Sequence, residues 1–159
     1  MPLDVNRLRE AAQKKRSRPP LSHAKIRDAE RAIGFALPPS VRRIYAEVGD
    51  GSFGPGYGFY GLSDGTEFFP KESVAYLYSL FRKGDPEDPS FAWPHMLLPI
   101  VDWGCAIRSC VDCSMPSLPM VRHDPNVEVD QFRPEGWHFE EWLQAWLDGY
   151  DLWKNEDAG

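Results

Sequence analysis

The spacing of proline and glycine constrains the fold of this chain more than any other feature of its sequence. The 15 prolines and 13 glycines cluster where one segment ends and the next begins, and the sequence contains no internal repeat and no low-complexity stretch. With 159 residues the chain is long enough to bury a core without disulfides or metals. We therefore expect one domain, built from short elements that follow one another in a single pass.

Four segments carry apolar residues at the spacing of an amphipathic helix: residues 23–33, 37–49, 73–82 and 139–147. Ser22 can cap the first of these helices, and Gly34 follows its last turn. The second opens at Leu37-Pro38-Pro39-Ser40, because proline is well tolerated in a first turn. The last places Trp142 and Leu143 on a broad apolar stripe, so we expect this helix to dock on a sheet.

Strand signals occur at the aromatic end of the glycine-rich stretch 49–61 and in three later segments: residues 97–102, 105–112 and 119–123. The corner Trp103-Gly104 separates two of the later segments, and the three together predict an antiparallel meander. The order helix, helix, strand, helix, strands, helix is neither strict βαβ alternation nor all-β. We therefore predict an α+β fold: a single domain with a mixed, largely antiparallel sheet and helices packed against it.

Charge is distributed unevenly along the chain. Residues 1–31 contain nine Lys or Arg against four Asp or Glu, a balance of +5, whereas the remaining residues contain nine against twenty, a balance of −11. An acidic body repels nucleic acid and attracts basic partners, so we expect a basic protein partner and no nucleic acid. The basic run at residues 14–18 lacks interleaved aromatic residues and fits a solvated tail.

Periodic apolar faces are expected only beyond residue 20. We therefore predict a flexible basic segment over 1–20, a folded domain over 21–153 and a tail over 154–159. No apolar run approaches the roughly 18 to 20 residues that span a bilayer, and the start of the chain lacks the apolar core of a signal peptide. Together with an odd number of cysteines, three, these features predict a cytoplasmic protein with free thiols and no membrane contact.

The cysteines offer partial zinc-ligand chemistry. Cys110 and Cys113 form a Cys-x-x-Cys pair, with Cys105 nearby and His123 on the next strand. A second such pair is missing, and in a strand of period two Cys105 and Cys110 point to opposite faces. Free thiols are therefore favoured over a metal site, and a redox role is disfavoured because its cysteine pair should open a helix. We expect no cofactor.

No coherent catalytic set is present. His123 and Asp124 are adjacent on a strand, so their side chains face opposite ways, and no nucleophile motif accompanies them. The glycine-rich stretch 49–61 has neither the Gly-Lys-Ser/Thr ending nor the following helix of a phosphate cradle. The sequence therefore predicts a protein that is not an enzyme.

Three groups of spaced residues resemble the pattern of one known family. They are Leu37-Pro38 with the turn Gly49-Asp50-Gly51, the strand end Asp102-Trp103-Gly104, and Phe139-x-x-Trp142-Leu143 in the closing helix. Over roughly residues 20–150 this pattern is similar to that of the SUKH superfamily, which contains the Smi/Knr cell-wall-synthesis regulators and bacterial immunity proteins of polymorphic toxin systems. The sequence departs from the pattern at Asp50, where asparagine is common, and in the cysteine-containing stretch 105–113.

The resemblance implies an α+β scaffold that binds other proteins and has no catalytic residues. Together with the acidic body, it predicts an immunity protein that neutralises a cognate bacterial toxin, such as a nuclease, by docking an acidic surface onto it. A regulator or scaffold of the Smi/Knr type, which binds an endogenous partner, remains an alternative. So does a metal or redox protein that uses the cysteines. The sequence does not indicate an oligomeric state.

Partner-binding residues are expected among the acidic and aromatic side chains of exposed loops. The predicted set is Asp50, Tyr57, Asp64, Glu67, Asp85, Glu87, Asp88 and Trp93. Trp137, next to Gly136, is a further candidate for an exposed aromatic anchor. Trp103 and Trp146 instead have the periodic setting of core residues.

Overall fold

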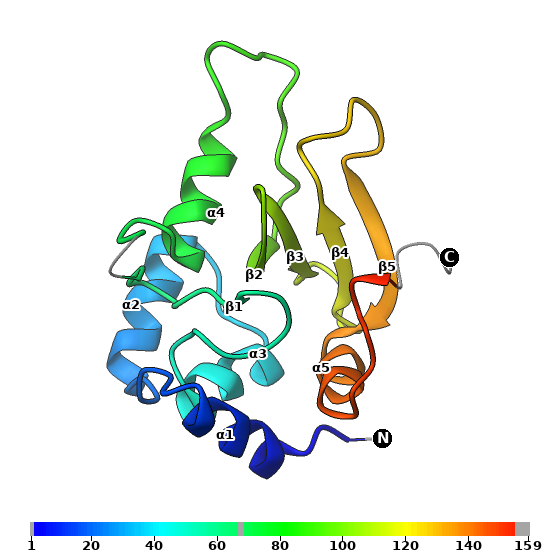
Figure 1. Cartoon of the computed structure of the whole chain (residues 1–159). Helices are drawn as coiled ribbons and strands as arrows, with labels where there is room; N and C mark the ends of the chain where they lie inside the picture. The colour runs from blue at the N-terminus through cyan, green and yellow to red at the C-terminus, as the bar shows by residue number, and fades with distance from the viewer. Residues whose placement is uncertain (1, 67–68, 155–159) are drawn as a thin grey trace.

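A meander of antiparallel strands forms the centre of the computed structural model, which describes residues 2–66 and 69–154 (Figure 1). The strands, each hydrogen-bonded to the next along the chain, are β1 (Gly58–Phe59), β2 (Leu97–Gly104), β3 (Ile107–Asp112), β4 (Pro119–His123) and β5 (Phe132–His138). The helical segments are α1 (Val5–Lys14), α2 (His23–Ile33), α3 (Pro39–Arg43), the π-helical turn η1 (Ile44–Val48), α4 (Val74–Lys83) and α5 (Phe139–Leu147). This arrangement confirms the predicted α+β fold.

The helix ends lie where the capping residues predict them. Ser22 Oγ accepts a hydrogen bond from the Lys25 amide at 3.3 Å, and Gly34 takes the left-handed conformation, φ +100°, that ends α2. The second predicted helix is divided in two, because α3 continues into η1, where the Gly49 amide bonds the carbonyl of Ile44 at 3.1 Å. The chain therefore turns sharply into the glycine-rich stretch that follows.

All five named strands pair antiparallel, so the sheet is not mixed; a single parallel bridge, Gly61 to Ser73, lies outside them. The meander expected from residues 97–123 is confirmed, with β4 at the predicted bounds. β5 was not predicted. Pro134 and Gly136 weaken its strand signal, but proline is compatible with an edge strand, and β5 is the last strand of the sheet.

The core lies between the sheet and the helices that pack on it. α2 contacts α4, which lies above it in Figure 1, and α4 packs on β2, while α5 packs on β4 and β5. Trp142 and Leu143 of α5 are fully buried, as their apolar spacing predicts, and Trp146 is half-buried. Burial of such large side chains supplies most of the stabilisation that holds α5 in place.

Residues 5–14 form the helix α1, within the segment 1–20 that the sequence predicts to be flexible. Asp4 caps it by accepting a hydrogen bond from the Arg7 amide at 3.1 Å, and Leu8 is fully buried in the core. Arg7 also bonds the Asp148 carboxylate at 2.8 Å and the Leu147 carbonyl at 2.7 Å, at the end of α5. The helix packs on the core because Val5, Leu8 and Ala12 form a narrow apolar stripe within an otherwise basic sequence. The boundaries at residues 20 and 153 stay predictions.

Among the described residues no helix combines the length and the apolar character that crossing a membrane requires.

Candidate functional site

Two acidic loops project from the same end of the molecule. The first tip, residues 84–90, follows α4, and the second tip, residues 124–131, joins β4 to β5; both lie at the top of Figure 1, opposite the basic helix α1. Asp85, Glu87 and Asp88 of the first tip are exposed, as predicted. The second tip carries three further carboxylates and exposes Val129. The second tip was not among the predicted partner-binding residues, although its Asp-Pro-Asn turn was a signal for an exposed loop.

Three of the six carboxylates in the tips accept hydrogen bonds from nearby backbone amides. Asp85 accepts a bond from the Glu87 amide at 2.9 Å, Asp88 from the Ser90 amide at 3.1 Å, and Asp124 from the Asn126 amide at 2.9 Å. Such Asx turns fix a side chain without neutralising its charge. None of the ion pairs found within 2–66 and 69–154 involves a tip carboxylate. The negative charge is therefore available to a partner.

A cluster of aromatic rings beneath the tips joins their bases. Trp93, which precedes β2, is buried and lies against His123 at the end of β4 and Phe132 at the start of β5, with ring centroids 4.9 and 5.3 Å apart. Its indole N–H donates to the Leu97 carbonyl at 2.7 Å. Trp93 was expected to be an exposed anchor, and this is wrong: a large ring in a loop can be buried when neighbouring strands supply a pocket. Its contacts join the segment after the first tip to the two strands that flank the second tip.

An aromatic groove lies next to the second tip. Two exposed aromatic rings line it: Tyr57 is 77% exposed, as predicted for an anchor, and Phe69 is 59% exposed. The groove has a volume of about 350 Å³, and its lining also includes Tyr60, Glu72, Asp102, Gly104, Cys105, Ala106 and Arg108. We refer to these nine residues as the Tyr57 groove. Asn126 of the second tip donates to the Cys105 carbonyl at 2.8 Å, so groove and tip form one continuous surface.

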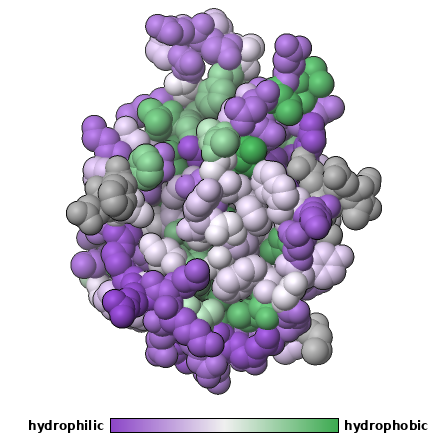
Figure 2. Space-filling model, in the orientation of Figure 1, coloured by the Kyte–Doolittle hydropathy of each residue, from purple (hydrophilic) through white to green (hydrophobic). Residues whose placement is uncertain are grey.

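Glycine positions allow the Tyr57 ring to lie where it does. A Cβ at Gly104, whose φ is +84°, would come 2.7 Å from the Tyr57 ring, and one at Gly56 would come 2.8 Å from the Trp103 ring. The Tyr57 amide donates to the Asp102 carbonyl at 2.8 Å. The Asp102-Trp103-Gly104 motif therefore positions the exposed tyrosine, because only glycine leaves room for the ring. Figure 2 shows residues of intermediate hydropathy across the middle of the view, hydrophobic residues above and below them, and hydrophilic residues at the upper and lower ends of the molecule.

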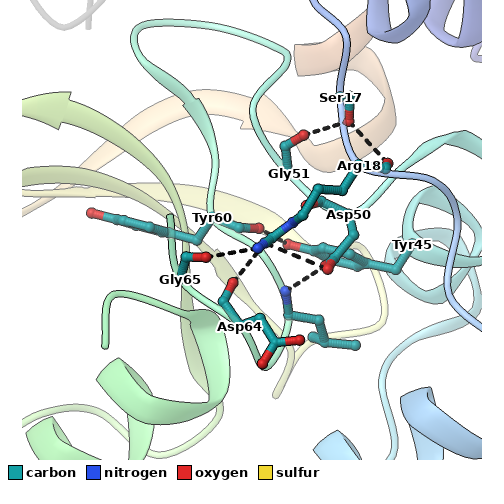
Figure 3. Close-up of polar contacts among 9 residues, drawn as sticks. Ser17, Arg18, Tyr45, Asp50, Gly51, Tyr60, Asp64 and Gly65 are labelled. Carbon is teal, nitrogen blue, oxygen red and sulfur yellow. Dashed lines mark hydrogen bonds and ion pairs between the residues drawn. The ribbon is translucent and has the colours of Figure 1, made fainter. Parts of the chain in front are cut away.

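Arg18 holds the loop beside the groove (Figure 3). Its guanidinium donates to the carbonyls of Asp64 and Gly65, both at 2.6 Å, and its Nε donates to the Asp50 carbonyl at 3.1 Å. Ser17 Oγ donates to the Gly51 carbonyl at 2.5 Å. Residues 17–18 therefore act as a clamp on two turns of the glycine-rich stretch, and the clamp leaves the Asp64 side chain exposed, as predicted.

Comparison with known proteins identifies a family for most of the chain. A model of the SMI1 / KNR4 family (SUKH-1) matches residues 20–145. The chain belongs to this family. No curated protein and no solved structure matches it. Members of the SMI1/KNR4 family are generally non-enzymatic, and membership supports a protein-binding role of the immunity or Smi/Knr type. The match confirms the resemblance seen in the sequence. α1 lies outside the matched residues, as does the segment after residue 145 to which Arg7 binds.

The residues of the SMI1/KNR4-like pattern have structural places. Leu37 is buried, its amide donates to Glu30 Oε2 at 2.6 Å, and Pro38 precedes α3. Gly51 has φ +90°, and a Cβ there would come 2.7 Å from the Gly61 amide nitrogen, so the turn requires glycine. Gly49 is buried against Ser17, where a Cβ would come 2.6 Å from Oγ. These residues therefore belong to the scaffold, whereas Asp102 and Gly104 of the same pattern line the Tyr57 groove.

Asp50 is the second correction to the predicted partner-binding set. It is buried, and its carboxylate accepts a bond from the Leu62 amide at 2.8 Å and lies 3.4 Å from Arg18. Burial raises the pKa of Asp50, and the Leu62 amide and Arg18 oppose that rise. Asp50 stands where asparagine is common in the family. Its carboxylate holds the turn by accepting the Leu62 amide and by pairing with Arg18. Glu67 lies outside the described residues.

The three cysteines differ in their exposure to solvent. Cys105 is exposed at the turn between β2 and β3, Cys110 is buried, and Cys113 is half-buried. Burial raises the pKa of Cys110, and raises that of Cys113 to about 12, so both thiols are protonated at neutral pH. In the part of the chain that the structure describes, no three His, Cys, Asp or Glu side chains are grouped to hold a metal ion. His123 lies in the aromatic cluster at the tip bases.

A wider depression, about 720 Å³ in volume, lies on another part of the surface. It is bounded by the segment before α3, the β3–β4 turn with the exposed Met115, and Glu140 at the start of α5. Arg43 and Glu140 are its charged side chains, and prolines and aliphatic groups form most of the remainder. It lacks the converging polar groups that mark a specific ligand site.

Proposed function

We propose that this protein is an immunity protein: it binds a basic toxin domain through the two tips and the Tyr57 groove, and thereby blocks the toxin's substrate site. The observation that carries the proposal is the projection of two carboxylate-rich tips from one end of the molecule, with their charges uncompensated by ion pairs of the described residues. Membership of the SMI1/KNR4 family supports a protein partner. A cytoplasmic site of action belongs to the same proposal.

The charge distribution favours association in one orientation. The first 31 residues, with a balance of +5, include α1 at the end of the molecule opposite the tips, while the remainder carries −11. A basic toxin is therefore attracted to the tips and repelled from the α1 end. Such steering raises association rates and falls steeply with salt, because the Debye length is about 8 Å at physiological ionic strength. The exposed Tyr57, Phe69 and Val129 supply apolar contact that slows dissociation.

A regulatory role of the Smi/Knr type is the second candidate, because the family supports both roles. The two differ in what the partner does when it is free. A toxin kills or arrests cells unless this protein is co-expressed, whereas an endogenous partner of a regulator is harmless alone.

The test begins with affinity capture from the native organism and expression of the captured partner alone and with this protein. We expect a basic partner that is toxic alone and harmless when co-expressed. Association rates are then measured across a salt series for the wild type and for the variant in which Asp85, Glu87 and Asp88 are changed to lysine. The reversal should slow association at least tenfold at low salt and much less at high salt.

The matched control reverses Glu10, Asp28 and Glu141, three exposed carboxylates on helices away from the tips. It changes the net charge by the same amount and should slow association far less than the tip reversal does. Equal slowing by both variants, or none by either, would remove the tips from the interface. A captured partner that is harmless alone would favour the regulatory role.

A further inference from the structure

The Tyr57 groove contains two carboxylates that form no ion pair within the part of the chain that the structure describes. Glu72 is half-buried, and its side chain makes no hydrogen bond or ion pair among residues 2–66 and 69–154. Asp102, also half-buried, accepts a bond from the Gly104 amide at 2.8 Å. A partly buried carboxylate is stabilised by a nearby positive charge. Because the guanidinium of Arg108 also lines the groove, the two carboxylates and this one cation give the groove a net charge of −1.

Arg108, the cation among the lining residues, bonds two other residues of the groove and packs on Phe81, which lies outside it. Its Nε donates to the Tyr60 hydroxyl at 2.9 Å and its Nη1 to the Ala106 carbonyl at 3.1 Å, and its guanidinium lies 5.1 Å from the centroid of the Phe81 ring. These contacts hold it against one wall. The space between Tyr57 and Phe69 therefore stays open to a ligand.

The groove also presents two exposed aromatic rings. Tyr57 and Phe69 present aromatic faces at the same groove as the carboxylates of Glu72 and Asp102. An aromatic face attracts a cation through its quadrupole, and a guanidinium also stacks on the ring while it donates to carboxylates in a fixed planar geometry. An anionic ligand would be repelled, and a purely apolar one would leave both carboxylates desolvated.

We propose that the Tyr57 groove is a receptor site for one arginine side chain of the protein partner. The proposal rests on the proposed function for the source of that arginine, but the site itself is a property of this chain. The guanidinium lies between Tyr57 and Phe69 and pairs with Glu72 and Asp102. A bound arginine covers Cys105 at the groove wall, which links this site to the second tip through the Asn126 bond.

The groove is tested with a probe that needs no partner. N-acetyl-arginine amide is titrated into isotope-labelled protein, and N-acetyl-citrulline amide, which has the same shape without the charge, serves as the matched probe. We expect chemical-shift changes centred on residues 57–60, 72 and 102–106 with the arginine probe and not with citrulline. N-acetyl-lysine amide should bind more weakly than arginine. Equal shifts with citrulline, or shifts spread over both tips, would overturn the proposal.

Variants assign the binding to named side chains. Glu72→Gln should weaken the arginine probe about threefold or more, because it removes a partly buried carboxylate while keeping its size. Tyr57→Ala should weaken the probe by a similar factor. Glu10→Gln, the same change on α1, is the control and should leave binding unchanged. If Glu72→Gln and the control bind alike, the groove is not the site.

Measurements of partner association test the arginine site and the proposed function separately. If the tip reversal slows partner association while Glu72→Gln and Tyr57→Ala do not, the toxin-binding role stands and the arginine site is wrong. If no toxin is found but the groove still prefers arginine over citrulline, the site stands and its partner is of another kind. Alkylation of Cys105 by iodoacetamide provides a second readout, since a bound arginine peptide should slow it.

Discussion

Arg122 of β4 and Glu135 of β5 form an ion pair inside the protein, with Nη2 and Oε1 3.1 Å apart and both side chains 1% exposed. The indole N–H of Trp142 donates to the same Glu135 oxygen at 3.4 Å. Arg122 also donates to the carbonyls of Leu152 and Trp153, and its guanidinium lies 4.8 Å from the centroid of the Trp153 ring. The pair therefore joins two neighbouring strands, α5 and the segment after it.

Replacing Arg122 with methionine should lower the free energy of unfolding by about 3–5 kcal/mol at pH 7, because a buried carboxylate loses its cation. Burial already raises the pKa of Glu135, and loss of Arg122 raises it further. A carboxyl group whose pKa is higher in the folded than in the unfolded state favours folding at low pH, so the deficit should shrink as the pH falls. Urea unfolding at several pH values measures both effects. Arg27→Met, an exposed change on α2, is the control and should cost little.

His123 should make the protein less stable as the pH falls. Burial and the positive charge of Arg108 lower the pKa of His123 to about 4, from an unfolded value near 6.5. The unfolded state therefore binds the extra proton between these values, and stability is lost as the pH falls from about 6.5 towards 4. The contribution is about 2–3 kcal/mol over that range.

The histidine effect is read as a difference in slope between variants. His123→Gln should flatten the dependence of the unfolding free energy on pH between 4 and 6.5, whereas His23→Gln, at the exposed start of α2, should not. Because His123 packs on Trp93 at the base of both tips, tryptophan fluorescence should report the same transition. An unchanged slope in His123→Gln would contradict the assignment.

Arg18→Ala should loosen the loop beside the groove and cost about 1–3 kcal/mol, since it removes hydrogen bonds to three carbonyl groups. Hydrogen exchange at the Leu62 amide, which bonds the Asp50 carboxylate, should become faster. Lysine should not restore protection, because one ammonium group cannot reach these acceptors in the geometry of a guanidinium. Exchange at Leu62 that is equal in Arg18→Ala and wild type would contradict the clamp.

Only Cys105 should react rapidly with iodoacetamide at neutral pH. It is exposed, whereas burial keeps Cys110 protonated and holds the pKa of Cys113 at about 12. Mass spectrometry should show one fast equivalent in the native protein, none in Cys105→Ser, and three after denaturation. Two fast equivalents in the native protein would show that the Cys113 thiol is accessible and ionised.

The purified protein should contain no stoichiometric zinc. The exposed Cys105 and the buried Cys110 lie in different environments, and His123 is enclosed by aromatic rings. Elemental analysis of protein prepared without chelators measures this. One zinc ion per chain, with unfolding on addition of a chelator, would restore the metal hypothesis.

The sequence by itself determined the elements that depend on local order. Ser22 and Gly34 mark the two ends of α2, and the apolar stripe that contains Trp142 predicts α5 and its buried face. Residues 97–123 form the predicted meander. These features rest on contacts within a few residues, or on a periodicity that any buried face imposes. The SMI1/KNR4-like pattern was readable for the same reason, since it consists of turn glycines and core positions.

Tertiary structure alone decided the environment of single side chains. Trp93 and Asp50 both lie in loops, where exposure is the ordinary expectation, yet distant elements bury them: strands β4 and β5 enclose the indole, and Arg18 with the Leu62 amide satisfies the carboxylate. The union of Tyr57, Glu72 and Cys105 in one groove likewise depends on strand pairing across more than thirty residues. Periodicity determines which face of an element is buried, but which residues meet across the fold is set by long-range packing that no local pattern encodes.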